Sequence, residues 1–323
     1  MKKFLSEIKI LNINDVAVIS FYILLTVLNI IFYTRIEQWI ICVLVNIGII
    51  IFVITVAYLE KKSGKSFWKY IHYWYLAPLV LLTFKEIYLM VKPIRIYDFD
   101  HLLIQADRFI FGFDPTVELA KIANPILTEI LQISYGTFYL LPIILGVSLM
   151  RNRKYLALDF SLFCVIYGFF LSYIGYFLLP AIGPRFTLHD FHNINIELPG
   201  LWLTNFLREI VNMGESIPSG TPNPEQVVQR DVFPSGHTQM TLITMYLSWK
   251  FNSKTKYFLI PNGALLIFAT VYLRYHYVID LIGGLLFMMF TIWSGKHLFF
   301  KWKRFTSEPE LTEQINHIYQ LAE

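Results

Sequence analysis

Eight apolar runs, each bounded by polar or charged residues, decide what this chain can fold into. Helices of about 17 to 25 apolar residues match the roughly 30 Å hydrocarbon core of a bilayer. With 56% hydrophobic and 15% charged residues and a mean hydropathy of +0.53, the 323-residue chain is too apolar for an ordinary soluble domain. We therefore predict an all-α integral membrane protein. The eight predicted spans are Val16 to Tyr33, Trp39 to Tyr58, Tyr70 to Val91, Ile126 to Met150, Ala157 to Leu179, Thr238 to Trp249, Tyr257 to Leu273 and Tyr277 to Phe300.

Lys and Arg gather in every second segment between these runs. They concentrate in the N-terminus, in the loops after the second, fourth and sixth runs, and in the tail. Loops rich in Lys and Arg stay cytoplasmic, so we predict eight crossings of the cell (inner) membrane with both termini cytoplasmic. This topology, which uses no motif, places Arg185, His237 and His276 together on the extracytoplasmic face.

The net charge of +4 follows largely from these cytoplasmic anchors, which would meet anionic lipid. No nucleic-acid partner is needed to explain it. The first run lacks an obvious cleavage site, so we interpret it as a retained anchor. Cys42 and Cys164 lie in different spans and are interpreted as packed thiols. The oligomeric state and the redox compartment are left open.

No repeat or low-complexity linker divides the chain, so one helical bundle is expected. We predict two N-terminal transmembrane helices in residues 1–66, a bundle in residues 67–305 and a cytoplasmic tail in residues 306–323. Two outer segments interrupt the bundle, at residues 92–125 and 181–234. The first has apolar residues at helical spacing and predicts an outer interfacial helix. The second is rich in turn-forming residues and predicts a lid or substrate-selecting loop.

The tetrapeptide Pro234-Ser235-Gly236-His237 precedes the sixth run. Pro234 gives a rigid start, Ser235 is a good N-cap, and Gly236 lets a ligand approach the backbone closely. Free amides at a helix N-terminus attract anions, so we expect Ser235 and Gly236 to bind an anion with His237 beside it. An N-cap followed by an interfacial histidine is the alternative.

His276 and Asp280 lie four residues apart at the start of the eighth run. On a helix this spacing places both on one face, so the carboxylate can hold one imidazole nitrogen while the other points outward. Ionisable residues in a membrane segment are costly and mark function when they face the bundle interior. The pattern favours a histidine nucleophile, and a structural pair is the alternative. Gly283 and Gly284 on the same helix favour close packing.

Two arginines flank these motifs. Arg185 follows Pro184, where the fifth helix must end because proline cannot continue it. A guanidinium at this point can bind phosphate oxygens bidentately. Arg274 lies two residues before His276, in the turn between the last two runs, and is a second candidate phosphate ligand. Interfacial anchoring is the alternative for both.

The order GPRF, FPSGHT and YLRYHYVIDLIGG (residues 183–186, 233–238 and 272–284) resembles the membrane-integral type 2 phosphatidic acid phosphatase superfamily. The resemblance is closest to the branch that includes inositol phosphorylceramide synthases, because FDHLLIQADRFIFGFDPT (residues 99–116) is similar to an outer-loop element of that branch. It covers roughly residues 94–284. It implies a six-helix catalytic bundle, here preceded by two extra transmembrane helices.

The same resemblance implies the roles of the site residues. His276 would attack phosphorus and form a phosphohistidine, Asp280 would orient and activate it, and His237 would protonate the leaving oxygen. Arg185 would hold the phosphate. Phosphoryl transfer needs alignment and charge stabilisation more than elaborate covalent machinery, and no metal or cofactor is predicted.

The chain departs from the widespread phosphatase pattern at two cations. Leu178 stands where that pattern has a Lys seven positions before the first-motif Arg, and the Arg-Pro order becomes Pro184-Arg185. Thr270 stands where the pattern has an Arg six positions before the final His. These departures argue against a substrate with a doubly charged terminal phosphate. Arg274 is a candidate replacement for one of the two missing cations.

We therefore predict a lipid phosphotransferase similar to inositol phosphorylceramide synthase, which passes a substituted phosphoryl group from a phospholipid to a lipid hydroxyl. One alternative is a lipid phosphate phosphatase acting on phosphatidic acid, isoprenyl pyrophosphate or a similar lipid phosphate. The alternative of another class is a non-catalytic anionic-lipid binder or transporter. The headgroup and the acceptor stay open.

Several other polar residues have open interpretations. His189 and His192 have only weak metal-ligand spacing and no evident third ligand. Lys85 and Glu86 form either a buried polar contact or a feature of the rim. Four residues of the first outer segment either line the pocket or are solvated on an interfacial helix: Asp98, Asp100, His101 and Asp107.

The aromatic residues, including Tyr135 and Tyr139, are interpreted as packing and as part of an interfacial belt.

Overall fold

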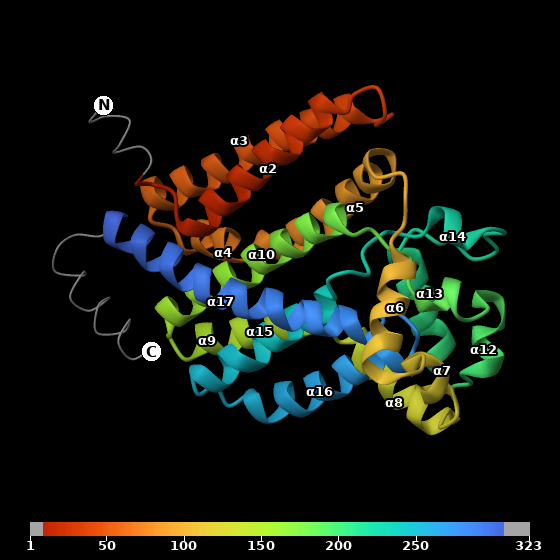
Figure 1. Cartoon of the computed structure of the whole chain (residues 1–323). Helices are drawn as coiled ribbons and strands as arrows, with labels where there is room; N and C mark the ends of the chain where they lie inside the picture. Colours follow the sequence, from red (N-terminus) through yellow and green to blue (C-terminus); the bar gives the residue numbers. More distant parts are fainter. Residues whose placement is uncertain (1–8, 307–323) are drawn as a thin grey trace. The chain divides into compact units, whose positions relative to one another are not determined.

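The computed structural model describes residues 9–306, and in that range every regular element is a helix (Figure 1). The predicted all-α membrane fold is therefore confirmed. The chain divides into two compact units: the first contains residues up to Ile94, residues 152–170 and residues from Phe290 on, and the second contains residues 95–151 and 171–289. The domain limits expected at residues 66 and 305 stay predictions. The tail, apart from Thr306, and Lys2 and Lys3 lie outside the described residues.

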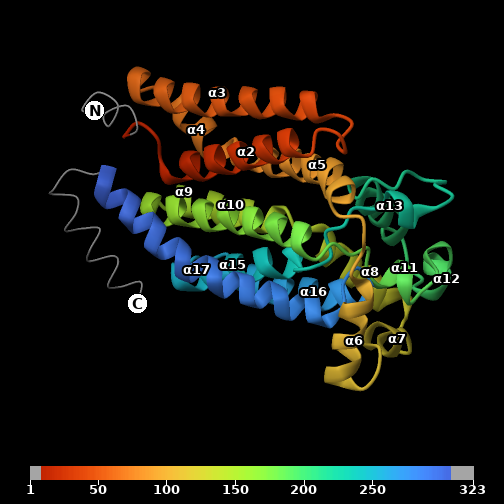
Figure 2. The same ribbon diagram turned by 45° about the horizontal axis from the view of Figure 1, so that its top comes forward.

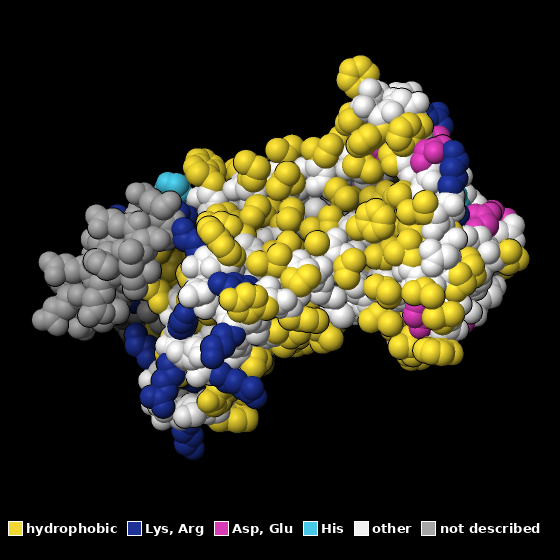
Figure 3. All heavy atoms as spheres, turned by 90° about the horizontal axis from the view of Figure 1, so that it is seen from below, with side chains coloured by type: hydrophobic (Ala, Val, Ile, Leu, Met, Phe, Trp, Pro, Cys, Tyr) yellow, Lys and Arg dark blue, Asp and Glu magenta, His cyan; other side chains and the backbone are white. Residues whose placement is uncertain are grey.

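Among residues 9–306, five helical segments are long and apolar enough to cross a membrane. They are α2 (Ile13–Ile31), α3 (Trp39–Ser63), the segment Ser66–Ile94, α10 (Tyr155–Leu178) and α17 (Val278–Thr306). A sixth span results if α8 (Pro125–Gly136) and α9 (Leu140–Arg151), which are bent by 54°, count together. Apolar side chains cover most of the face in Figure 3. A multi-pass membrane protein is thus supported.

The two remaining predicted spans are helical but shorter. They form α15 (Gly236–Lys250) with 15 residues and α16 (Lys256–Tyr272) with 17 residues. The eight apolar runs are thus all helical, and the eight crossings stay a prediction. The third run is divided between α4 (Ser66–Trp74) and α5 (Leu76–Ile94), and the fourth between α8 and α9.

The first unit buries polar side chains between its helices. α2 starts with a capping box, because the Asn12 side chain accepts the N–H of Asp15 while the Asp15 carboxylate accepts the N–H of Asn12. In α5 the Glu86 carboxylate accepts amide hydrogen bonds from Asn29 (2.9 Å) and Asn46 (2.8 Å). Glu86 is therefore a buried polar contact, whereas the neighbouring Lys85 is exposed.

The second unit contains all the motif residues. It includes α6 (Asp100–Phe111), α7 (Pro115–Ala120), α8, α9, α15, α16 and the first part of α17. Short helices occupy the long second outer segment: α11 (Pro184–Thr187), η1 (Phe191–Asn193), α12 (Ile194–Glu197), α13 (Thr204–Gly214) and α14 (Pro224–Val227). Both views of the ribbon show α12 and α13 near the end of α8 (Figures 1 and 2).

α15 and α16 connect the two ends of the second unit. α15 starts at Gly236 beside His237 and ends at Lys250, and α16 returns from Lys256 to Tyr272, four residues before His276. The basic loop between them therefore lies at the far ends of both helices from the two histidines. Within this unit, the basic loop between α15 and α16 and the two imidazoles lie at opposite ends of these helices.

α6 is amphipathic, but its acidic side chains are buried and some of its apolar side chains are exposed. Its carboxylates face inward, with Asp100 at 6% and Asp107 at 2% exposure, whereas Phe109 is 91% exposed. Solvation of an interfacial helix therefore does not account for these two acids. Asp98 forms an ion pair with Arg230, whose Nε lies 3.2 Å from Asp98 Oδ1, and His101 is exposed.

One small apolar cluster joins α6 to the motif segments. It consists of Leu103, Ala181, Val232 and Tyr277, all buried. These residues come from α6, from the loop before Arg185, from the segment before Pro234 and from the start of α17. Each buried side chain of Val or Leu size contributes on the order of 1.5–3 kcal/mol. Packing in this cluster thus brings segments that are distant in sequence to one place.

Candidate functional site

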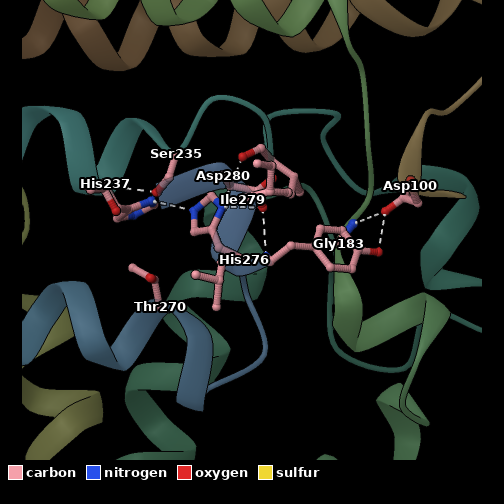
Figure 4. Close-up of polar contacts among 12 residues, drawn as sticks. Asp100, Gly183, Ser235, His237, Thr270, His276, Ile279 and Asp280 are labelled. Carbon is pink, nitrogen blue, oxygen red and sulfur yellow. Dashed lines mark hydrogen bonds and ion pairs between the residues drawn. The ribbon is translucent and has the colours of Figure 1, made fainter. Parts of the chain in front are cut away.

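The two histidines of the motifs contact each other. His276 Nε2 lies 3.5 Å from His237 Nδ1, and the ring centroids are 5.6 Å apart (Figure 4). His237 occupies the first turn of α15 and His276 the turn before α17. His276 is buried, with 4% exposure. The structure thus places both imidazoles in one site.

The other ring nitrogen of His276 is held by acceptors. Nδ1 lies 3.0 Å from the carbonyl oxygen of Val232 and 3.4 Å from Asp280 Oδ2. A carbonyl oxygen only accepts, so Nδ1 must carry the proton, and Nε2 is left with the lone pair. Burial lowers the pKa of His276 well below its ordinary value, because the charged form is poorly solvated. A neutral imidazole with Nε2 toward His237 is therefore favoured.

Asp280 is fully buried, and besides contacting His276 it accepts a backbone hydrogen bond. Its Oδ2 accepts the backbone N–H of Tyr277 at 2.7 Å, which ties the carboxylate to the turn that carries His276. Its backbone carbonyl accepts the N–H of Ser235 at 3.0 Å. Asp280 thus fixes His276 and also joins the start of α15 to α17. The direct bond from Nδ1 goes to the backbone carbonyl of Val232, a partner that no sequence pattern identifies.

Ser235 and Gly236 form the start of α15 as the sequence predicts. The Ser235 hydroxyl oxygen accepts the N–H of Thr238 at 3.2 Å. A Cβ at Gly284 of α17 would lie 2.7 Å from the Ser235 carbonyl oxygen, and one at Gly236 would lie 2.5 Å from the Tyr176 hydroxyl. Glycine at these two positions therefore permits the close approach that brings the imidazoles together.

Two buried carboxylates of α6 hold the motif backbones. Asp107 accepts the N–H groups of Val278 (2.9 Å) and Ile279 (2.8 Å), and so caps α17. Asp100 accepts the N–H of Gly183 at 2.8 Å and the Tyr277 hydroxyl at 2.8 Å (Figure 4). Burial raises the pKa of both carboxyl groups, while the N–H donors oppose the shift. α6 thus positions the turn that carries His276.

Replacing Asp107 by alanine is expected to lower the melting temperature of the purified protein by about 2–4 °C, since losing a helix cap costs about 0.5–2 kcal/mol. Turnover should fall as well, because the cap lies next to His276. The control is Asp114→Ala, which breaks an ion pair with Arg108, whose side chain is 55% exposed. Equal effects of the two substitutions in thermal denaturation would contradict a capping role for Asp107.

Arg185 is buried among aromatic rings and acceptors. Its guanidinium carbon lies 5.0 Å from the Tyr275 ring centroid, and NH1 donates to Asn212 Oδ1 at 3.1 Å. NH2 forms an ion pair with Glu215. The positive charge of Arg185 also contributes to the lowered pKa of His276, which places the guanidinium within electrostatic reach of the imidazole.

Arg274 adopts a left-handed backbone conformation, with φ at 68°. Such a conformation costs a non-glycine residue about 1–3 kcal/mol and is common at functional sites. Its carbonyl oxygen accepts the N–H of Arg185 at 3.1 Å, so the two arginine-bearing turns are joined. Its side chain is 2% exposed and forms an ion pair with Glu197. The backbone of Arg274 therefore lies at the site, while its guanidinium is bonded to the outer segment.

Tyr135 forms one wall of the site. Its ring stacks on His237 at 4.6 Å and on Tyr275 at 4.5 Å between centroids, and it is 3% exposed. Arg185, Tyr275, Tyr135 and His237 thus form a continuous row. Tyr139, in contrast, is 40% exposed. Aromatic residues are so abundant in this chain that sequence spacing alone does not single out Tyr135.

His189 and His192 lie apart from the imidazole pair. His189 Nε2 is 3.0 Å from the Thr116 hydroxyl, and burial lowers its pKa to about 4. His192 is exposed. Within residues 9–306, no group of three or more His, Cys, Asp and Glu side chains is placed to hold a metal ion.

Comparison with known proteins agrees with the motifs. Residues 101–294, more than half of the chain, match the family model of the PAP2 superfamily. The chain is 25% identical over 186 residues to a PA-phosphatase related-family protein of Dictyostelium discoideum, a match covering 52% of this chain and 32% of that relative. The chain thus spans about a third of the relative's length. No solved structure matches it. The chain belongs to the PAP2 superfamily.

Proposed function

We propose that this protein is a membrane lipid phosphotransferase that passes a substituted phosphoryl group through His276. The observation that carries the proposal is the pair of contacts made by His276: Nδ1 is held by Val232 and Asp280, and Nε2 faces His237 Nδ1 at 3.5 Å. Superfamily membership supports a lipid phosphatase or phosphotransferase. A nucleophile with a fixed tautomer and an adjacent proton donor suits either reaction.

The proposed reaction has two balanced steps. In the first, which begins with His237 as the imidazolium, His276 Nε2 attacks phosphorus and forms a P–N bond while the P–O bond to the leaving lipid alcohol breaks. The leaving oxygen takes the proton from His237 Nδ1, and His237 becomes neutral. In the second, an acceptor hydroxyl attacks phosphorus and gives its proton to His237, and the P–N bond breaks. Both imidazoles return to their starting states. A phosphoryl group does not fit between nitrogens 3.5 Å apart, so substrate binding must separate the rings.

The proposal places the site on the extracytoplasmic side of the cell membrane. Lys250, Lys254 and Lys256 lie at the opposite ends of α15 and α16 from His237 and His276. Because basic loops stay cytoplasmic, the histidines belong near the outer leaflet, with both termini inside. The first two helices have no assigned role in the reaction.

A phosphodiester is favoured over a phosphomonoester as the substrate for a chemical reason. Leu178 and Thr270 stand where the widespread phosphatase pattern has two cations, and Leu178 is 59% exposed while Thr270 is fully buried. A site with fewer cations suits a singly charged phosphodiester better than a doubly charged terminal phosphate. The proposed donor is therefore a phosphodiester lipid, and the proposed acceptor is a lipid with a free hydroxyl.

The acceptor requirement tests this proposal. Purified protein in mixed micelles receives a panel of phosphodiester lipids carrying a labelled headgroup, with and without a ceramide-like or diacylglycerol-like acceptor. We expect the labelled headgroup to appear on the acceptor lipid, with little release of free phosphoalcohol in its absence. Release of phosphate or phosphoalcohol at the same rate without acceptor would establish a hydrolase instead. Headgroup binding without any turnover would support an anionic-lipid binder.

A further inference from the structure

We propose that Glu215 selects singly charged phosphodiesters against doubly charged phosphomonoesters by neutralising Arg185, the proposed phosphate ligand. This inference rests on the proposed function and assigns a specificity-determining residue to the same site. Glu215 follows α13, within the outer segment that the sequence predicts as a substrate-selecting loop. None of the recognised motifs includes it.

The contact between Arg185 and Glu215 is largely shielded from solvent. The Arg185 side chain is 3% exposed and the Glu215 side chain 14% exposed. Arg185 also donates to Asn212, one turn earlier on α13. Asp231 adds a further negative charge, since it contributes to raising the pKa of Arg185 against the effect of burial. When a phosphate approaches Arg185, the positive charge of the guanidinium is therefore already balanced by carboxylates.

The second candidate phosphate cation is matched in the same way. Arg274 forms an ion pair with Glu197, the last residue of α12, whose side chain is 41% exposed. α12 is held in turn by Arg208 of α13, which donates to Asn195 and, at 3.1 Å, to the carbonyl oxygen of Leu198. Both motif arginines are thus paired with carboxylates from one segment.

Backbone contacts fix the position of α13 and therefore of Glu215. The carboxylate of Glu129 in α8 accepts the N–H groups of residues 201–204, at 2.6 to 3.2 Å, and the Thr204 hydroxyl at 2.6 Å. At the other end of α13, the Glu215 carbonyl oxygen accepts the N–H of Gln229 at 3.3 Å. Glu215 is therefore a fixed part of the site and not an exposed side chain that meets Arg185 by chance.

The effect of Glu215 on substrate binding depends on the charge of the substrate phosphate. A phosphomonoester has a second pKa of about 6 and carries close to two negative charges at neutral pH, whereas a phosphodiester carries one. Like charges at close range cost more where the surroundings exclude water. A carboxylate beside the phosphate site therefore penalises the doubly charged lipid more than the singly charged one, and selection arises from repulsion.

The test compares two lipids competing in the same micelle. One is phosphatidic acid, and the other is whichever phosphodiester lipid with the same acyl chains the wild-type protein turns over fastest. The measured quantity is the ratio of kcat/KM for the monoester to that for the diester. We expect Glu215→Gln to raise this ratio by about five- to tenfold, roughly 1–1.4 kcal/mol. The matched control is Glu209→Gln, an exposed residue of the same helix, which should leave the ratio unchanged.

The ratio does not depend on how much of a preparation is folded, because inactive protein contributes to neither rate. Glu197→Gln is a second variant with a half-exposed carboxylate, and a smaller change in the same direction is expected. If the wild-type protein turns over lipid but neither variant raises the ratio, the inference is overturned while the proposed function stands. If the wild-type protein prefers phosphatidic acid, the inference is also overturned. If it turns over no lipid, the proposed function itself fails.

Discussion

Replacing His276 by alanine is expected to reduce lipid turnover by at least about 10⁴-fold, the largest effect of any single substitution in this chain. The reason is that no other group can supply the electron pair of Nε2, which forms the bond to phosphorus under the proposed mechanism. Loss of a catalytic nucleophile removes a covalent route, and comparable substitutions in well-studied enzymes cost about 10⁴- to 10⁶-fold. Lipid binding should be largely kept, because Arg185 and the helix start at Ser235 are unchanged.

Steady-state turnover in mixed micelles and retention of a labelled phosphodiester lipid by the detergent-solubilised protein provide the two measurements. The matched control is His192→Ala, since His192 is an exposed histidine outside the imidazole pair. We expect that variant to keep both turnover and binding. If His276→Ala weakens binding and leaves turnover per bound lipid unchanged, the nucleophile assignment is wrong.

Replacing His237 by alanine is expected to have the second-largest effect, and the size should depend on the leaving group. General acid catalysis contributes about 10²- to 10⁴-fold, so a natural lipid alcohol, which needs a proton as it departs, should react more slowly by that factor. Nitrophenol leaves as a stable anion without a proton, so the turnover rate of a nitrophenyl substrate should fall much less. The rates for the two substrates, measured on the same preparation, give the required comparison.

His276→Ala is the contrasting variant in this experiment. It should abolish reaction with both leaving groups, because phosphorus is attacked in each case. If His237→Ala slows the natural lipid and the nitrophenyl substrate equally, His237 does not act as the proton donor. Packing of His237 against Tyr135 would then be its main contribution.

The helices and the motif positions follow from the sequence because they depend on local patterns. Apolar runs of spanning length became helices, and Ser235 caps α15 as its residue type predicts. His276 Nδ1 lies 3.4 Å from Asp280 Oδ2, although His276 precedes α17 and does not lie on the helix as its spacing predicts. α10 stops at Leu178, before Pro180, and Pro184 instead starts the short helix α11, so Pro184 does not end the fifth helix as the sequence predicts. Short-range physics was sufficient for the helices and the cap.

The partners of the motif residues were not predictable, because they come from segments without a local signature. The acceptor for His276 Nδ1 is the backbone carbonyl of Val232, which any residue type would provide. Glu197 and Glu215 lie in a segment of short helices and turns whose path depends on tertiary contacts. The inward-facing acids of α6 are the exception, because carboxylates alternate with apolar residues in that part of the sequence. The pattern does not decide whether these carboxylates face water or protein.

Buried Asp107 shows why that ambiguity could not be resolved from the sequence. A carboxylate on an amphipathic helix is usually solvated, and burial is tolerated only when donors satisfy it. The donors here are the N–H groups of Val278 and Ile279, 171 and 172 residues further along the chain. Such pairing at long range has no sequence period.

The most direct test of the account is capture of the phosphorylated enzyme. Wild-type protein is mixed with a phosphodiester lipid, quenched in alkali within milliseconds to seconds, digested and examined by mass spectrometry. We expect a substituted phosphoryl group on Nε2 of His276 that is lost in acid, and that fails to accumulate in His276→Ala. A protein that turns over lipid at the wild-type rate while His276 stays unmodified at every quench time would contradict the account.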